Sequence, residues 1–163
     1  LEMSELHSVP CEDDIELGPL SEEVLTDLAP LAEHKDIVLN CSGGALIIGS
    51  DTLLYRLVFN LVENAIRYSR PGSTVNVSIC DNDSHVFLRV EDQGPGIPKQ
   101  YRESIFQPFF RLDKSRSRAY GGAGLGLALV WEIAALHGGT DEVQATSENR
   151  ATMLTTLPKP TAA

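Results

Sequence analysis

The chain has 163 residues, of which 42% are hydrophobic and 22% are charged, values typical of one globular domain and not of a disordered chain. The 23 acidic residues outnumber the 13 basic ones, and the formal net charge of −10 disfavours nucleic acid as the partner. No apolar run approaches the roughly 18 residues that a membrane-spanning helix needs. Three widely separated cysteines, Cys11, Cys41 and Cys80, form no paired motif and predict reduced thiols in a cytoplasmic setting.

The first part of the chain predicts a linker, a short helix and a hairpin. Residues 1–20 are acidic and interrupted by proline and glycine, so we expect them to be irregular. A helix is expected to begin at Ser21, whose hydroxyl can cap it, and to run to about Ala32. Two short apolar strands, 37–39 and 46–48, flank a serine–glycine–glycine turn and predict a hairpin.

The rest of the chain alternates between strand and helix periodicity. The predicted elements are a helix over 51–68, a β-hairpin of strands 75–79 and 86–90, an apolar helix over 125–136, and closing strands at 143–146 and 153–157. Regular strand–helix–strand units are absent from this order. The pattern therefore predicts an α+β sandwich, with helices on one face of a mixed sheet.

The helix over 51–68 carries a polar face that could have a chemical role. Asn60, Asn64 and Arg67 lie on one side of the helix, away from its apolar stripe. Carboxamide oxygens suit a hard cation, and a guanidinium suits a phosphate. The alternative is an ordinary solvated helix surface, which is the more common reason for such a face.

Two glycine-rich segments follow. In the segment 92–98, which comes directly after a strand, glycines allow a ligand to approach the backbone, and Asp92 could accept a hydrogen bond from an exocyclic amine. The segment 121–127 opens an apolar helix, where free N–H groups and the helix dipole can bind an anion. An ordinary loop and a flexible joint are the alternatives. The second segment is neither a P-loop nor a Rossmann fingerprint.

A phenylalanine-rich segment, 106–111, lies between the two glycine segments and is followed by a basic stretch at 114–118. It predicts either a small satellite core that anchors a basic loop or a hinged lid whose cations close over a triphosphate. The two interpretations are compatible, because a lid needs an apolar hinge.

Taken in order, these stretches resemble the ATP-binding catalytic domain of bacterial sensor histidine kinases, within the wider family shared with gyrase. The resemblance covers most of the chain, from about residue 20 to 157. The matching motifs are an N box at 60–69, a first glycine box at 92–96, an F box at 106–111 and a second glycine box at 122–127. Each motif is modest alone, but four in the right order and spacing are specific.

The resemblance implies a Bergerat-type α/β sandwich, a mixed and mostly antiparallel sheet covered on one face by about three helices. It also implies a mobile ATP lid over residues 112–121. Residues 20–158 would form the ATP-binding catalytic domain. Residues 1–19 would be a linker or the tail of a preceding dimerisation hairpin, and 159–163 a C-terminal tail.

The resemblance also implies roles for individual residues. Asn64 would bind Mg²⁺ with Asn60 on the same face, Asp92 would accept from the adenine amine, and Arg111 would reach the γ-phosphate. Catalysis would rest on Asn60, Asn64 and Arg111. The other implied nucleotide contacts are Arg67, Tyr68, Gly94, Gly96, Ile97, Phe110, Gly122, Gly124, Leu125, Gly126 and Leu127.

The implied reaction is transfer of the γ-phosphoryl group of Mg-ATP to a histidine, for relay to a response-regulator aspartate. Residues 7–10 do not fit the family's phosphoacceptor motif, so we expect that histidine on a dimerisation domain outside this chain. The full-length protein would be a homodimer anchored in the inner membrane, and the isolated cytoplasmic domain a monomer that binds no nucleic acid.

Two other classes of function remain open. ATP-hydrolysing relatives and anti-sigma serine kinases resemble one another in carrying a glutamate where this chain has Asn60, and an amide cannot act as a general base. Neighbouring Glu63 is displaced around the helix. This argues against self-contained hydrolysis. The other alternative is a non-catalytic module that docks a partner when nucleotide is bound.

Overall fold

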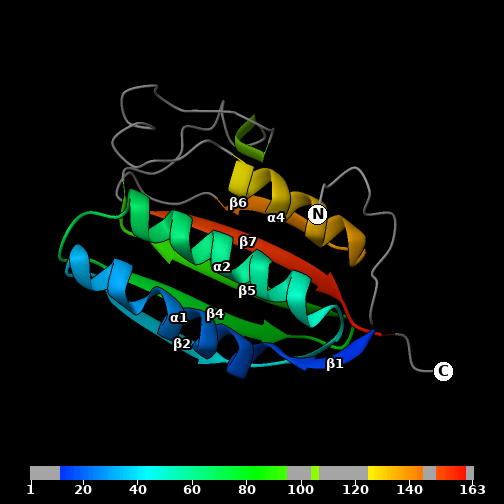
Figure 1. Ribbon diagram of the computed structural model, residues 1–163. Helices are drawn as coiled ribbons and strands as arrows, with labels where there is room; N and C mark the ends of the chain where they lie inside the picture. Colours follow the sequence, from blue (N-terminus) through cyan, green and yellow to red (C-terminus); the bar gives the residue numbers. More distant parts are fainter. Residues whose placement is uncertain (1–11, 95–103, 107–124, 145–149, 161–163) are drawn as a thin grey trace.

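The computed structural model describes residues 12–94, 104–106, 125–144 and 150–160. Within these ranges, three α-helices lie side by side on one face of a five-stranded sheet (Figure 1). The elements are β1 (Asp13–Glu16), α1 (Leu17–His34), β2 (Val38–Gly43), β3 (Leu46–Gly49), α2 (Asp51–Tyr68), β4 (Thr74–Asp81), β5 (His85–Asp92), the 3-10 helix η3 (Ser104–Phe106), α4 (Leu125–Leu136), β6 (Thr140–Gln144) and β7 (Ala151–Pro158).

The main sheet has the strand order β2-β4-β5-β7-β6. Only β2 and β4 are parallel, and the other neighbouring pairs are antiparallel. The predicted α+β class, with a mixed, mostly antiparallel sheet and one helix-covered face, is confirmed. A separate two-stranded sheet of β1 and β3 was not expected.

Helix α2 has the bounds that its periodicity predicts. Ser50 caps its first turn, since its hydroxyl oxygen accepts a hydrogen bond from the Leu53 N–H at 3.2 Å. The apolar stripe is buried against the sheet and the neighbouring helices. Its members are Leu53, Leu54, Leu57, Val58, Leu61, Val62, Ala65 and Ile66.

Strands β4 and β5 form the predicted hairpin. In each of them alternate residues face the helices and are buried, as expected for a sheet with one covered face. The closing strands β6 and β7 pair as predicted, and their register is antiparallel. Strand β6 begins at Thr140, three residues before its expected start, and residues 145 and 146 lie outside the described ranges. The core therefore lies between the helix layer and one face of the sheet.

The hairpin expected between residues 37–39 and 46–48 is wrong. Both segments are strands, but β2 pairs in parallel with β4, and β3 pairs with β1. Residues 13–16 supply the edge that β3 joins, where Ile15 and Ile47 face each other and are both buried. The turn between β2 and β3 instead holds the start of α1, because the Ala45 carbonyl accepts from the Leu17 N–H at 3.0 Å.

The irregular structure expected up to residue 20 is also wrong for residues 13–20. Helix α1 begins at Leu17, four residues before the expected cap at Ser21. Pro19 lies in the first turn, where the helix requires no N–H donor. Leu17 and Leu20 gain burial in the core. Pro30 does not end the helix, which continues to His34.

Cys41 and Cys80 are free thiols, as their separation in the sequence predicts. Cys11 lies outside the described ranges. No helix in the part of the chain that the structure describes is both long enough and apolar enough to cross a bilayer.

Candidate functional site

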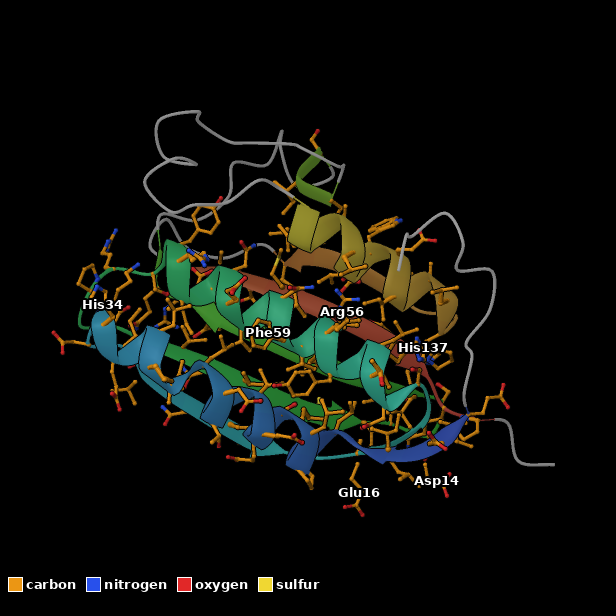
Figure 2. All side chains as sticks on the ribbon, in the orientation of Figure 1. Asp14, Glu16, His34, Arg56, Phe59 and His137 are labelled. Atoms are coloured by element: carbon orange, nitrogen blue, oxygen red, sulfur yellow. The ribbon has the colours of Figure 1, made fainter. Side chains whose placement is uncertain are left out.

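The C-termini of α2 and β5 lie at the same end of the molecule, and α4 begins on the same side, nearer the middle of α2 (Figure 1). Helices α2 and α4 run antiparallel. The start of α2 lies beside the end of α4, where the Ser50 N–H donates to His137 Nε2 at 3.1 Å. Figure 2 shows His137 at this opposite end, where α4 finishes beside the start of α2. The fold thus gathers chain segments that are far apart in the sequence.

The polar face of α2 changes character along the helix. Arg56, in the N-terminal half, is exposed, whereas Asn60, Asn64 and Arg67 are all half-buried. Glu63 and Arg67 form an ion pair with 3.7 Å between charged atoms. The C-terminal half is therefore a recessed polar surface with carboxamide and guanidinium groups on it, and differs from the freely solvated face around Arg56.

Asp92 is a buried acceptor at the end of β5. Only 8% of the residue is exposed. Its Oδ1 accepts a hydrogen bond from the Gly94 N–H at 2.9 Å. Burial raises the pKa of this carboxyl to about 6, although hydrogen bonds from the Gly94 and Ala151 backbones oppose the shift. At neutral pH the group is mostly ionised and can accept from an N–H donor of a ligand.

The first glycine turn packs directly on the end of α2. A Cβ at Gly94 would overlap the Tyr68 carbonyl oxygen, so only glycine permits this approach. The Gln93 N–H donates to Ser69 Oγ at 3.4 Å, and Gln93 Oε1 accepts from the Thr74 N–H at 2.8 Å. The structure therefore brings together the C-terminus of the asparagine-bearing helix and the first glycine turn.

The start of the phenylalanine-rich segment is anchored on α4. Ile105 and Phe106 in η3 are buried, and the Phe106 ring lies 5.3 Å from the ring of Trp131, between centroids. Leu127, near the start of α4, packs against the core. An apolar anchor of this kind is what both interpretations of the segment require.

Several predicted site residues lie outside the described residues, as does the expected lid at 112–121. They are Gly96, Ile97, Phe110, Arg111, Gly122 and Gly124. Leu125 and Gly126 are the first residues of α4. The described part of the site is therefore the half built from α2, β5 and the beginning of α4.

This arrangement is that of a known family, since residues 49–161 match the histidine kinase-, DNA gyrase B- and HSP90-like ATPase family. The chain belongs to this family. The sensor-like histidine kinase SenX3 of Mycobacterium tuberculosis is 36% identical over 163 residues, 97% of this chain and 40% of the relative. The chain thus spans less than half the length of this curated relative.

Solved structures agree with this assignment. The mycobacterial sensor histidine kinase MprB has a TM-score of 0.80 and 30% identity, covering 92% of this chain and 99% of that one. Full-length ShkA, solved in complex with AMPPNP, also has a TM-score of 0.80, with 27% identity over 93% of this chain and 32% of its own. The chain is an ATP-binding catalytic domain of the sensor histidine kinase type.

The structure adds supporting residues to this ATP-binding domain that sequence reasoning missed. Lys35, at the end of α1, donates from Nζ to the main-chain carbonyls of Ile66, Arg67 and Ser69 at 2.9, 3.0 and 2.7 Å. Ser69 and Gln93 then join the end of α2 to the glycine turn. The one available signal was that α2 ends without a glycine cap, which leaves its last carbonyls in need of another donor.

Proposed function

We propose that this domain binds Mg-ATP between the C-terminal ends of α2 and β5 and the beginning of α4. It would donate the γ-phosphoryl group to a histidine. That histidine would lie on the dimerisation domain of the same protein, outside this chain, and a response-regulator aspartate would receive the group next. The observation that carries the proposal is the packing of the Asp92–Gly94 turn on the end of the asparagine-bearing helix.

The adenine base would be read by Asp92, with Gly94, Gly96 and Ile97 shaping the pocket. A buried carboxylate is a strong acceptor for the amino group of adenine. A base without an amino group at that position would leave the carboxylate charge buried and unpaired, which is unfavourable. The phosphates would lie toward Arg67, Tyr68 and the N-terminus of α4. The remaining contacts in this proposal are Phe110, Arg111, Gly122, Gly124, Leu125, Gly126 and Leu127.

The residues present fit Mg²⁺ when it arrives with the nucleotide. Asn64 offers a side-chain oxygen, the ligand type that this cation prefers, and Mg²⁺ is commonly held by one or two protein groups together with substrate phosphates. In the described ranges no group of three or more histidine, cysteine, aspartate or glutamate residues could hold a metal ion. Mg²⁺ bound in this way would neutralise charge on the phosphates.

The chemistry of α2 favours transfer to a histidine over transfer to water. A carboxamide at Asn60 cannot accept a proton, and Glu63 is paired with Arg67. An imidazole needs no general base, because its free nitrogen is already nucleophilic. That nitrogen would form the bond to the γ-phosphorus while the bond to the bridging oxygen breaks and ADP leaves.

The binding part of the proposal is tested with Asn64→Ala. We expect about tenfold weaker binding of a non-hydrolysable ATP analogue in the presence of Mg²⁺ by isothermal titration calorimetry, since one ligand to a charged group is lost. Binding in the presence of EDTA should not change. Asn76→Ala on the far face of the sheet, where Asn76 pairs with Asn40, is the matched control.

The transfer part is tested by adding the histidine-bearing domain of the parent protein and measuring acid-labile phosphohistidine. We expect phosphohistidine to form only when both parts and Mg-ATP are present. Steady release of inorganic phosphate by this domain alone, without phosphohistidine, would instead identify it as an ATPase. Nucleotide binding with neither product would identify a docking module.

A further inference from the structure

Lys35 occupies an unusual position between two elements of the helix layer. It follows α1 directly, and its side chain crosses to the C-terminus of α2, more than 30 residues further along the chain. Its own carbonyl accepts from the Gly72 N–H at 2.9 Å. Both its main chain and its side chain therefore bind the segment that leaves α2.

The end of α2 needs such a donor. Ser69, the C-cap residue, has extended dihedrals (φ −74°, ψ 151°), so the chain leaves the helix without the left-handed turn that usually satisfies the last carbonyls. Its N–H returns only to the Ala65 carbonyl, at 3.0 Å. The ammonium of Lys35 has three N–H donors, and the Ile66, Arg67 and Ser69 carbonyls accept from it.

The same helix end holds the first glycine turn in place. Ser69 supplies one carbonyl to Lys35 and its hydroxyl to the Gln93 N–H, so a single residue contacts both partners. The Tyr68 carbonyl lies against Gly94. The peptide that donates to Asp92 is therefore in direct contact with the last turn of α2.

Two opposing electrostatic effects act on the Lys35 ammonium. A cation at a helix C-terminus is favoured by the helix dipole. Burial, and secondarily the nearby Arg67 charge, lowers the pKa of the Lys35 ammonium. This means that the fold retains Lys35 beside another cation, a repulsive arrangement that the three carbonyl acceptors offset.

We propose that Lys35 is a positioning residue for the nucleotide site, which holds the end of α2 so that Asn64 and Tyr68 keep a set distance from the Asp92–Gly94 turn. Lys35 acts through the backbone and does not touch the nucleotide. The inference rests on the proposed function for its effect on ATP, but its effect on the glycine turn is independent of it.

The test is Lys35→Met, which keeps the length of the side chain and removes its donors. Lys159→Met is the matched control, because Lys159 pairs with Asp81, at 2.6 Å, away from the proposed site. We expect Lys35→Met to weaken binding of the ATP analogue about tenfold, whereas Lys159→Met changes it less than twofold. Amide hydrogen exchange at Gln93 and Gly94 should accelerate at least tenfold in Lys35→Met only.

The exchange measurement separates positioning from general stability. A merely structural lysine would accelerate exchange throughout the domain, and its removal would leave the affinity of the folded fraction unchanged. Either result overturns the proposal. If Lys35→Met does not fold, Ser69→Ala breaks the next link, and it should accelerate exchange at Gln93 and weaken binding in the same direction. Wild-type exchange rates at Gln93 in that variant would also overturn the proposal.

If the unaltered domain binds no nucleotide, the proposed function fails. The local acceleration at Gln93 and Gly94 then still decides the role of Lys35 in holding the turn.

Discussion

The backbone groups at the two ends of α2 obtain their hydrogen-bond partners in different ways. At the end away from the proposed site, α2 begins with the local cap of Ser50, and His137 adds a second hydrogen bond to the Ser50 N–H. At the site end, α2 finishes without a local cap, and the distant Lys35 supplies the donors. The start of α2 is therefore capped by the residue next to it, whereas its end depends on a residue that is distant in the sequence.

The end at His137 is packed for stability. The His137 Nδ1–H donates to the Ile133 carbonyl at 2.8 Å, so Nε2 is the acceptor in a neutral ring. A Cβ at Gly49 would overlap that ring. Ser50 is only 3% exposed.

Each end of the layer also has a buried carboxyl nearby, with different surroundings. Asp92 receives backbone N–H donors at the open glycine turn, whereas Asp141, on the strand after α4, receives the Thr155 hydroxyl on one oxygen and has no partner for the other. Burial raises the pKa of Asp92 to about 6 and that of Asp141 to about 7. The comparison teaches that burial alone does not distinguish these two carboxyls, whereas their neighbouring donors and the adjacent glycine do.

Replacing the site carboxylate should have the largest effect. For Asp92→Ala we expect affinity for the ATP analogue to fall on the order of 100-fold, because a charged hydrogen bond to the base is lost. Preference for adenine over guanine nucleotides should vanish. Asp81→Ala, which removes an exposed carboxylate at the other end of the hairpin, is the control for calorimetric titration with both nucleotides.

The same carboxyl predicts a pH dependence. Wild-type affinity for adenosine, which carries no phosphate, should decline as the pH falls below about 6, since protonated Asp92 loses its acceptor charge. An affinity that is constant between about pH 5 and 8, from roughly one unit below that pKa to two units above it, would contradict the assignment of Asp92.

The next prediction concerns Asp141, which has no role in the proposed nucleotide site. The folded-state pKa of Asp141 is raised to about 7, so the ionised form is disfavoured in the fold. Its penalty is absent below the unfolded value near pH 4, grows between about pH 4 and 7, and stays constant at higher pH. At pH 8 Asp141→Asn should therefore raise the free energy of unfolding on the order of 2 kcal/mol, with little difference near pH 4.

Urea unfolding at both pH values measures this, and nucleotide affinity should be unchanged. Equal stability differences at the two pH values would mean that Asp141 does not titrate as its burial implies. A loss of nucleotide binding in Asp141→Asn would mean that Asp141, like Asp92, contributes to the nucleotide site.

The smallest expected effect is at the far end of the pair. His137→Ala leaves the buried Ser50 N–H without its acceptor and should reduce the free energy of unfolding by about 1.5 kcal/mol. The folded domain should still bind the ATP analogue within about twofold of wild type. His34→Ala, at an exposed residue that ends α1 (Figure 2), is the control and should change neither quantity. A marked loss of affinity in His137→Ala would show that the two ends are coupled.

Much of this fold could be predicted from local pattern. The 3.6-residue periodicity was sufficient for the bounds of α2, and strict alternation was sufficient for the hairpin of β4 and β5. The packing of the Asp92–Gly94 turn on the end of α2 could be expected only through the resemblance of four motifs in order. The pairing of β2 with β4 could not, because an apolar strand has no local preference for one edge over another.

The sequence by itself determined most of the helices and strands, though not β1, and which residue types are available for cation, phosphate and base, because these follow from neighbours within a few positions. Only the tertiary structure decided that β3 joins β1, that α1 begins at Leu17, and that Lys35 closes the end of α2. Each of these depends on competition for burial or for unpaired carbonyls among segments far apart in the chain, and such competition leaves no local mark on the sequence.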